Sequence, residues 1–117
     1  MQFNPSAPIW MQVLEALEID IVTGKRQPGE KLPGGRDLAL SYGINPNTAA
    51  RVYQELERAN LCETRRGMGT FVTEDEAVIA AVREQFIRQT IQDFLRSMAQ
   101  LGETPESAAQ MILKEAE

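Results

Sequence analysis

The amino-acid sequence predicts a mainly helical α+β fold that contains one short β-hairpin. Before residue 60, apolar residues recur at the three- and four-residue spacing of amphipathic helices. Residues 62–72 form two strand-like runs on either side of the glycine-containing loop RRGMG. Beyond residue 74 the helical spacing returns and continues almost to the end of the chain. These observations predict helices, then a hairpin, then further helices.

Size and composition limit the classes of protein to consider. The 117 residues, of which 43% are hydrophobic, are enough for one small domain or a domain with an appendage. The chain has no histidine, and its single cysteine, Cys62, lies in LCETR, which predicts a strand with a buried thiol. Neither GxGxxG nor GxxxxGK[ST] occurs. We therefore expect no enzyme activity, no catalytic residue, no metal site and no cofactor.

The sequence also predicts a cytoplasmic protein without membrane contact. No segment approaches the roughly 20 apolar residues that a bilayer-spanning helix needs. The N-terminal residues MQFNPSAPIW lack the basic stretch and apolar run of a signal peptide. A single cysteine cannot form an internal disulfide, and nothing else in the sequence indicates export.

The net charge of −5 belongs to one part of the chain. Residues 1–73 contain eight basic and eight acidic residues, whereas residues 74–117 contain four basic and nine acidic ones. The overall acidity therefore says little about the surface of the N-terminal part.

The first helix is expected over about residues 9–23. Gly24 is its expected C-terminal cap, and Pro28-Gly29 suits the central positions of a type II turn. A short extended piece, Glu30-Lys31-Leu32, follows. A second, short helix is expected over about 35–42, with Gly43 ending it.

The third helix, over about 46–59, has the clearest start signal in the sequence. Asn45 is the expected N-cap, and Pro46 occupies the first helical position, where the missing N–H costs nothing. Its predicted buried stripe consists of Ala49, Val52, Tyr53 and Leu56. The opposite, outer face of the helix is polar and carries Asn47 and Arg51. Two helices joined by a tight turn at Gly43 form a helix-turn-helix unit.

Strands are expected at 62–64 and 70–72. Gly67 and Gly69 allow positive φ in the connecting loop, which carries Arg65 and Arg66 near its tip. A helix-turn-helix followed by a basic hairpin is a winged helix-turn-helix, here built from three helices and a hairpin wing. We expect this DNA-binding domain to cover residues 8–75.

Residues 76–117 are expected to form a two-helix dimerisation segment. A helix of about 25 residues ends near Gly102, and Thr104 and Pro105 begin a last helix. Two helices of one chain cover too little of the broad apolar stripe on the long helix, so a second subunit is the better explanation. A membrane-surface helix would instead need basic residues around the stripe, where carboxylates outnumber them. The candidate dimerisation residues are Val78, Ile79, Val82, Phe86, Ile91, Phe94, Leu95, Met98 and Leu101.

Four segments, PIWMQV, KLPGGRDLA, GINPNTAARVYQELE and ETRRGMGTFV, resemble the GntR family of bacterial winged-helix regulators in order and spacing. The short tail is similar to that of the YtrA subfamily. The resemblance implies a homodimeric regulator that binds a palindromic double-stranded DNA operator. It also implies a repressor, often one encoded beside the transporter genes that it controls.

The same resemblance implies which residues contact DNA. Polar residues at the start of the third helix would reach base edges in the major groove, and the wing tip would enter the minor groove. Two departures remove expected contacts, since Gly34 stands in place of a serine and Ala50 in place of an arginine. The candidate DNA-binding residues are Arg36, Asn45, Asn47, Thr48, Arg51, Arg65, Arg66 and Gly67.

Two questions stay open at the level of sequence. The winged helix could serve as a protein-interaction adaptor, but an adaptor has no reason to keep residues 65–73 free of carboxylates. Residues 74–117 are too few for a separate ligand domain, so a small-molecule effector would have to use the dimer interface or a cleft between segments.

Overall fold

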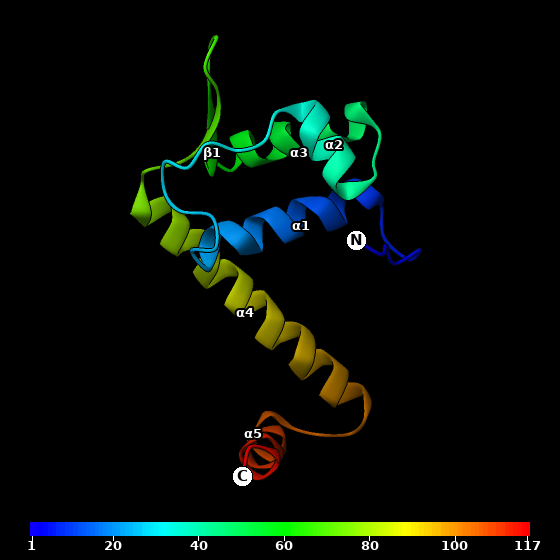
Figure 1. Cartoon of the computed structure of the whole chain (residues 1–117). Helices are drawn as coiled ribbons and strands as arrows, with labels where there is room; N and C mark the ends of the chain where they lie inside the picture. Colours follow the sequence, from blue (N-terminus) through cyan, green and yellow to red (C-terminus); the bar gives the residue numbers. More distant parts are fainter. The chain divides into compact units, whose positions relative to one another are not determined.

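The computed structural model describes all residues, 1–117, and consists of five helices and one β-hairpin (Figure 1). This is the mainly helical α+β fold that the sequence predicts. The chain divides into two compact units, Met1–Arg83 and Glu84–Glu117. No helix combines the length and the apolar character needed to cross a membrane. The elements are α1 (Ile9–Val22), α2 (Gly35–Tyr42), α3 (Pro46–Arg58), β1 (Cys62–Arg65), β2 (Gly69–Val72), α4 (Glu76–Gln100) and α5 (Pro105–Glu115).

The first unit is built around one apolar core to which α1, α2, α3 and the hairpin all contribute. α1 buries Val13, Leu17 and Ile21, which share one face because they are spaced four residues apart. Gly24, with φ +81°, ends the helix in the left-handed conformation, as expected. The remaining buried residues of this core are Leu32, Leu38, Ala39, Ala49, Val52, Leu56, Leu61, Cys62 and Val72.

The turn between α2 and α3 has the predicted chemistry. Gly43 adopts φ +67° after α2, a left-handed conformation that costs glycine little. The Asn45 side chain accepts a hydrogen bond from the backbone N–H of Asn47 at 2.8 Å, and Pro46 follows as the first helical residue. Ala49, Val52 and Leu56 are fully buried on α3, whereas Tyr53 is half-buried at the edge of the core. The predicted phase of α3 is therefore confirmed.

We expect Asn45→Ala to lower the free energy of unfolding by about 1 kcal/mol, because the substitution removes this N-cap. Urea unfolding at a fixed protein concentration measures the change. Asn60→Ala is an informative comparison at the other end of α3. Asn60 is exposed and follows the C-cap in the left-handed conformation, with φ +61°, and the N–H groups of Asn60 and Leu61 donate to the carbonyls of Glu57 and Leu56. Its substitution keeps these backbone bonds, so it should act through backbone strain alone. An Asn45→Ala chain as stable as the unmodified chain would contradict a stabilising role for the cap.

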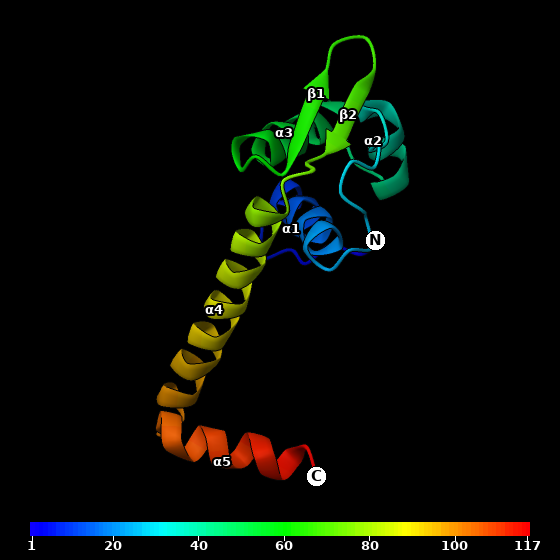
Figure 2. The same cartoon turned by 90° about the vertical axis from the view of Figure 1, so that its left-hand side faces the viewer.

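The hairpin is the antiparallel pair β1–β2, in which Cys62 lies opposite Val72 and Arg65 opposite Gly69 (Figure 2). A third chain segment extends this sheet. The N–H of Leu32 donates to the carbonyl of Thr70 at 2.7 Å, and the N–H of Val72 donates to the carbonyl of Glu30 at 2.8 Å. The short extended segment Glu30–Leu32, which the sequence predicts, thus bonds β2 and holds the base of the hairpin in place.

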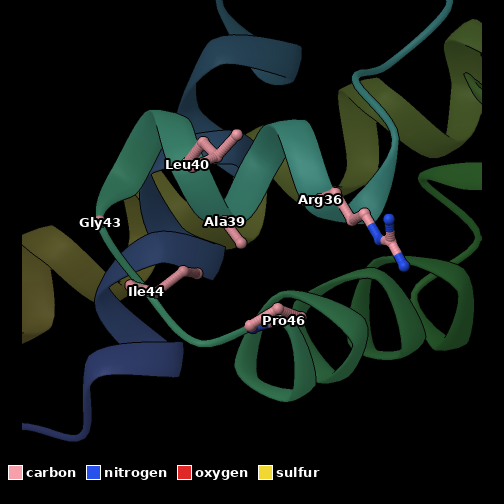
Figure 3. Close-up of a pocket in the computed structure, with 6 residues that line it drawn as sticks. All are labelled: Arg36, Ala39, Leu40, Gly43, Ile44 and Pro46. Atoms are coloured by element: carbon pink, nitrogen blue, oxygen red, sulfur yellow. The ribbon is translucent and has the colours of Figure 1, made fainter.

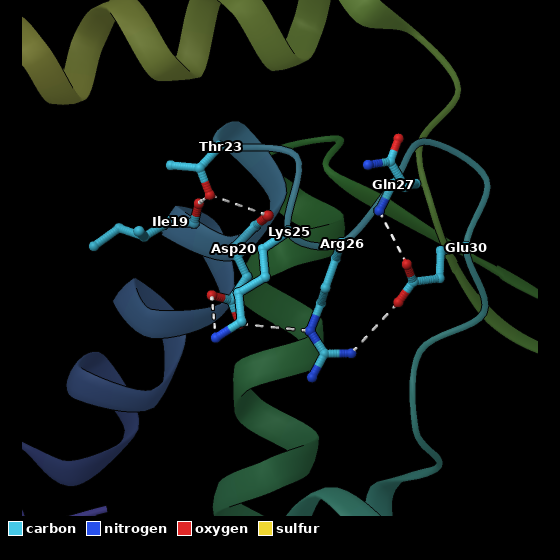
Figure 4. Close-up of polar contacts among 7 residues, drawn as sticks. All are labelled: Ile19, Asp20, Thr23, Lys25, Arg26, Gln27 and Glu30. Atoms are coloured by element: carbon cyan, nitrogen blue, oxygen red, sulfur yellow. Dashed lines mark hydrogen bonds and ion pairs between the residues drawn. The ribbon is translucent and has the colours of Figure 1, made fainter.

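A group of charged side chains holds the turn that leads from α1 into this segment (Figure 4). Arg26 lies between Asp20 at the end of α1, at 3.6 Å, and Glu30, at 3.9 Å. Glu30 also accepts a hydrogen bond from the backbone N–H of Gln27 at 3.0 Å. Gly29, with φ +79°, completes the turn. These contacts connect the end of α1 to the base of the wing.

α4 is one continuous helix of 25 residues, but its first turns belong to the first unit. Val78, Ile79 and Val82 are half-buried and pack against the core of the winged helix. The division into units therefore falls at 83/84, whereas the sequence places a domain boundary at 75/76. The difference arises because these three residues, expected in a dimer interface, already have apolar partners within their own chain.

The second unit contains the rest of α4 and α5. Thr104 and Ser107 form a capping box at the start of α5, with Pro105 at the first helical position. Ala108 is the only fully buried residue of this unit. The apolar side chains that stay exposed here include Ile87, Ile91, Phe94, Leu101, Met111, Ile112 and Leu113.

Candidate nucleic-acid interface

The outer face of α3 carries a group of short polar and basic side chains. Asn47, Arg51 and Gln54 are exposed, and Thr48 is half-buried beside them. Ala50 is exposed on the same face and contributes no polar group. Because the opposite face of the helix is fully buried, the backbone of this polar face is fixed by the core. Such a face presents amide and guanidinium groups to a partner without rearrangement of the helix.

Asn45 is only partly available for a partner. Its side-chain oxygen is used by the cap of α3, which leaves the side-chain NH₂ group as its free donor. The predicted role of Asn45 in contacting DNA is thereby restricted to hydrogen-bond donation. Asn47 has no such restriction, since only its backbone N–H takes part in the cap.

Arg36 lies in the first turn of α2, beside the start of α3. The hydroxyl of Tyr53 donates a hydrogen bond to the carbonyl of Pro33, which ties the loop before α2 to α3. Burial raises the pKa of Tyr53 to about 12, so the hydroxyl keeps its proton for this bond. Gly34 gives α2 no side-chain cap, in agreement with the loss of a hydroxyl noted in the sequence.

An apolar hollow of about 390 Å³ lies between α2 and the start of α3 (Figure 3). Figure 3 shows the Arg36 guanidinium at one end of the gap between the two helices and Gly43 at the other. Leu40, on the outside of α2, is 81% exposed. The full lining consists of Arg36, Ala39, Leu40, Gly43, Ile44 and Pro46.

Arg51 does not extend freely into solvent. Its Cζ atom lies 3.9 Å from the ring centroid of Trp10, which belongs to the first turn of α1. This is a cation–π contact between two helices. The sequence identified Arg51 as a surface cation but gave no indication of this partner.

The two wing arginines differ in their surroundings. Arg65 is half-buried, with its guanidinium 4.4 Å from the ring centroid of Phe71 and 2.8 Å from a carboxylate oxygen of Glu63. Arg66 is exposed at the tip and forms no ion pair in the structure. Gly67, with φ +76°, lies in the predicted loop, and Gly69, with φ +118°, begins β2. Of the two cations, Arg66 has the free guanidinium.

We therefore expect Arg66→Ala to weaken DNA binding more than Arg65→Ala. The salt slope of binding is the slope of the logarithm of the binding constant against the logarithm of the salt concentration. Loss of one phosphate contact reduces its magnitude by about one unit. Arg65→Ala removes a charge that Glu63 already compensates, so its salt slope should change less. Fluorescence anisotropy of one labelled duplex at several salt concentrations measures both. An equal change of slope in the two variants would contradict the assignment.

The two carboxylates at the C-terminal end of α3 are engaged by other groups. Glu55 pairs with Arg58 at 3.2 Å, and Glu57 accepts a hydrogen bond from the hydroxyl of Thr64. The Cys62 thiol is buried, and burial raises its pKa to about 12, so it is not a nucleophile at neutral pH.

Three residues that the site prediction did not include also belong to the candidate surface. Gln54 lies on the same face of α3 as Asn47 and could have been included from helical spacing alone. Lys31 is exposed beside the wing, so close to Gly69 that a Cβ at Gly69 would lie 2.8 Å from its Cε atom. Trp10 and Lys31 reach their positions through contacts between distant segments, which spacing does not reveal.

A helix-turn-helix with a polar, exposed second helix, followed by a hairpin with a basic tip, defines a winged helix-turn-helix DNA-binding protein. Comparison with known proteins agrees with this class. The pattern of "Bacterial regulatory proteins, gntR family" matches residues 11–72. The chain belongs to the GntR family.

Two relatives from Bacillus subtilis are similar over most of their length. The HTH-type transcriptional regulator YhcF is 36% identical over 95% of this chain and 92% of its own. The HTH-type transcriptional repressor YtrA is 37% identical over 80% of this chain and 77% of its own. Both are named as transcriptional regulators and not as enzymes, and the likeness to YtrA confirms the subfamily that the sequence suggests.

Solved structures show the same fold. A GntR family regulator from Listeria monocytogenes has a TM-score of 0.90 and 34% identity, covering 96% of this chain and 98% of its own. The DNA-binding domain of AraR, in complex with operator ORX1, has a TM-score of 0.57 and 27% identity. The match covers 62% of this chain and 93% of the AraR chain.

Proposed function

We propose that this protein is a cytoplasmic transcriptional repressor that binds a palindromic DNA operator as a homodimer. One observation carries the proposal: the exposed start of α3 and the wing tip present free hydrogen-bonding groups and cations on the same unit. On α3 itself, Glu55 is paired with Arg58 and Glu57 accepts a hydrogen bond from the hydroxyl of Thr64. The operator complex of the related AraR domain supports DNA as the partner.

In this proposal α3 is the recognition helix. Asn47 and Thr48 read base edges in the major groove, where an amide can form two hydrogen bonds to adenine. Arg36 and Arg51 hold phosphates or guanine from either side of the helix. Arg66, with the backbone of Gly67, follows the adjacent minor groove. Arg65 supports the wing through Phe71 and Glu63 and contributes less to binding.

A second copy of the chain is the proposed occupant of the apolar surface in the second unit. A groove of about 560 Å³ runs between α4 and α5, lined by Phe94, Met98, Met111, Ile112, Glu115 and Ala116. No residue of α4 is fully buried within the chain, although eight of the nine candidate dimerisation residues lie on this helix. Exposed apolar surface of this kind marks an interaction site. Because Val78, Ile79 and Val82 have partners in their own chain, the dimer contact would rest on Phe86, Ile91, Phe94, Leu95, Met98 and Leu101.

The repressor role rests on the likeness to YtrA, which is named as a transcriptional repressor. Occupation of an operator blocks transcription without any further activity of the protein. A small-molecule effector, as the family resemblance allows, would use the dimer interface, because the second unit, Glu84–Glu117, contains a single fully buried residue, Ala108.

Selection of bound duplexes from a random-sequence DNA library by the full-length chain tests the proposal. We expect an enriched sequence with two inverted half-sites. The Arg36→Ala/Arg66→Ala variant should bind that sequence at least tenfold more weakly, since each lost contact to DNA costs about 1–3 kcal/mol. Arg83→Ala/Arg88→Ala is the matched control: it removes two exposed arginines of α4 that form no ion pair and lie outside the candidate surface. No enriched sequence, or equal losses in both variants, would contradict the proposal and favour a protein-interaction adaptor.

A further inference from the structure

The contact between Trp10 and Arg51 joins the first turn of α1 to the outer face of the proposed recognition helix. Trp10 is half-buried and packs against the hydrophobic core, so its ring is held in place. The residues that precede it are also fixed, because the Gln12 side chain bonds the backbone of Asn4 and Ala7 at 2.6–2.9 Å. The indole thus forms a fixed platform beneath a long, flexible arginine.

A guanidinium group stacked on an aromatic ring keeps its hydrogen-bonding capacity. Its N–H donors lie in the plane of the group, and stacking occupies only its face. Arg51 forms no ion pair, and Glu55, one turn further along α3, is paired with Arg58. The edge of the Arg51 guanidinium is therefore free, while its position is set by the ring 3.9 Å away.

Arg65 provides an internal comparison. It also lies over an aromatic ring, that of Phe71, but its Nε and Nη2 atoms both bond Glu63, at 3.1 and 2.8 Å. Arg65 is thus stacked on a ring with its hydrogen-bonding edge occupied, whereas Arg51 is stacked with this edge free. Only the second arrangement prepares a cation to bind an external anion.

We propose that Trp10 is a positioning residue for Arg51 in DNA binding. This proposal rests on the proposed function. The indole does not itself touch DNA: it restricts the rotamers of Arg51, so that a phosphate contact costs less conformational entropy. Ordering a flexible side chain costs about 0.5–1.5 kcal/mol at an interface, which corresponds to a roughly two- to twelvefold change in affinity.

A double-mutant cycle between the two positions tests this proposal with the full-length chain and the DNA duplex that it selects from a random library. Arg51→Ala should weaken binding about tenfold and lower the salt slope by about one unit. Trp10→Leu, which keeps an apolar side chain of moderate size, should weaken binding about three- to tenfold with an unchanged slope. The double variant should bind like Arg51→Ala alone. Trp10→Phe should recover part of the loss, because a smaller ring still stacks.

Several outcomes would overturn the proposal. Fully additive losses in the double variant would mean that Trp10 acts independently of Arg51. A Trp10→Leu chain with lowered thermal stability and unchanged affinity for DNA would show a purely structural ring. Failure of the proposed function is distinguishable, since it would abolish the effect of Arg51→Ala itself or all binding by the unmodified chain.

Fluorescence gives a second readout because Trp10 is the only tryptophan. Arg51→Ala should change the emission of the free protein, since it removes the group that covers the ring. Addition of the selected duplex should alter Trp10 emission when Arg51 is present and much less in Arg51→Ala. Arg88→Ala, which removes an exposed arginine of α4, should behave like the unmodified chain. Identical emission spectra for Arg51→Ala and the unmodified chain would contradict stacking in solution.

Discussion

A chain that ends at Arg83 should be a folded monomer that binds the selected operator about 10²–10⁴-fold more weakly than the full-length protein. The cut follows the division between the two units and keeps Val78, Ile79 and Val82, which pack against the winged-helix core. It removes the apolar residues of α4 and α5 that have no partner in the chain. Two linked DNA-binding units gain this factor through effective concentration alone, without any additional contact.

Analytical ultracentrifugation and titration with one palindromic duplex measure both consequences of this truncation. The monomer should retain non-specific binding with a salt slope about half that of the dimer, because each subunit supplies its own phosphate contacts. A truncated chain that binds the palindrome as tightly as the full-length protein would rule out the dimer mechanism. So would a full-length protein that sediments as a monomer at concentrations where it occupies the operator.

A second truncation, after Thr73, is the informative control for stability. It removes the same tail and also the three α4 residues that cover the core. This chain should be monomeric and also less stable than the chain ending at Arg83, by several kcal/mol for the lost burial of three aliphatic side chains. Equal stability of the two truncated chains would indicate that the first turns of α4 contribute nothing to the winged helix.

Local chemistry made much of the fold predictable. Asn45 and Pro46 mark the start of α3 within one residue, because capping and a missing N–H are properties of the adjacent backbone. Gly67 and Gly69 locate the hairpin loop for a similar reason, since positive φ is strained for other residues. The four segments that resemble the GntR family supplied the order of these elements and their expected partner.

Contacts between distant segments were not predictable in this way. Which side chain covers Trp10 depends on how α1 crosses α3, and the pairing of Lys31 with the wing depends on the path of the 24–32 turn. The contacts made by the first turns of α4 were not predictable either, since helical spacing identifies an apolar stripe but not the residues that cover it. The Arg65–Glu63 pair was different. Residues two apart on a strand share a face, so alternation alone could have identified it.

Leu56→Ala should lower the free energy of unfolding by about 2–5 kcal/mol, the largest effect on stability that we expect from a single substitution here. Leu56 is fully buried on α3 and belongs to the core shared by the three helices and the hairpin. Shortening it removes apolar contacts and leaves a cavity that the surrounding helices fill only in part. A marginally stable small domain would lose much of its total stability from this one change.

Leu40→Ala is the matched control, with the same chemical change at a leucine that is 81% exposed on α2. Its effect should stay within about 0.5 kcal/mol, because an exposed leucine gains little from burial. Urea unfolding of both full-length variants at one protein concentration keeps any contribution from dimerisation constant. The midpoint should shift strongly for Leu56→Ala and hardly for Leu40→Ala, with similar m-values. Equal shifts would mean that Leu56 is not in the core and that the outward face assigned to Asn47, Arg51 and Gln54 is wrong, because the phase of α3 determines both.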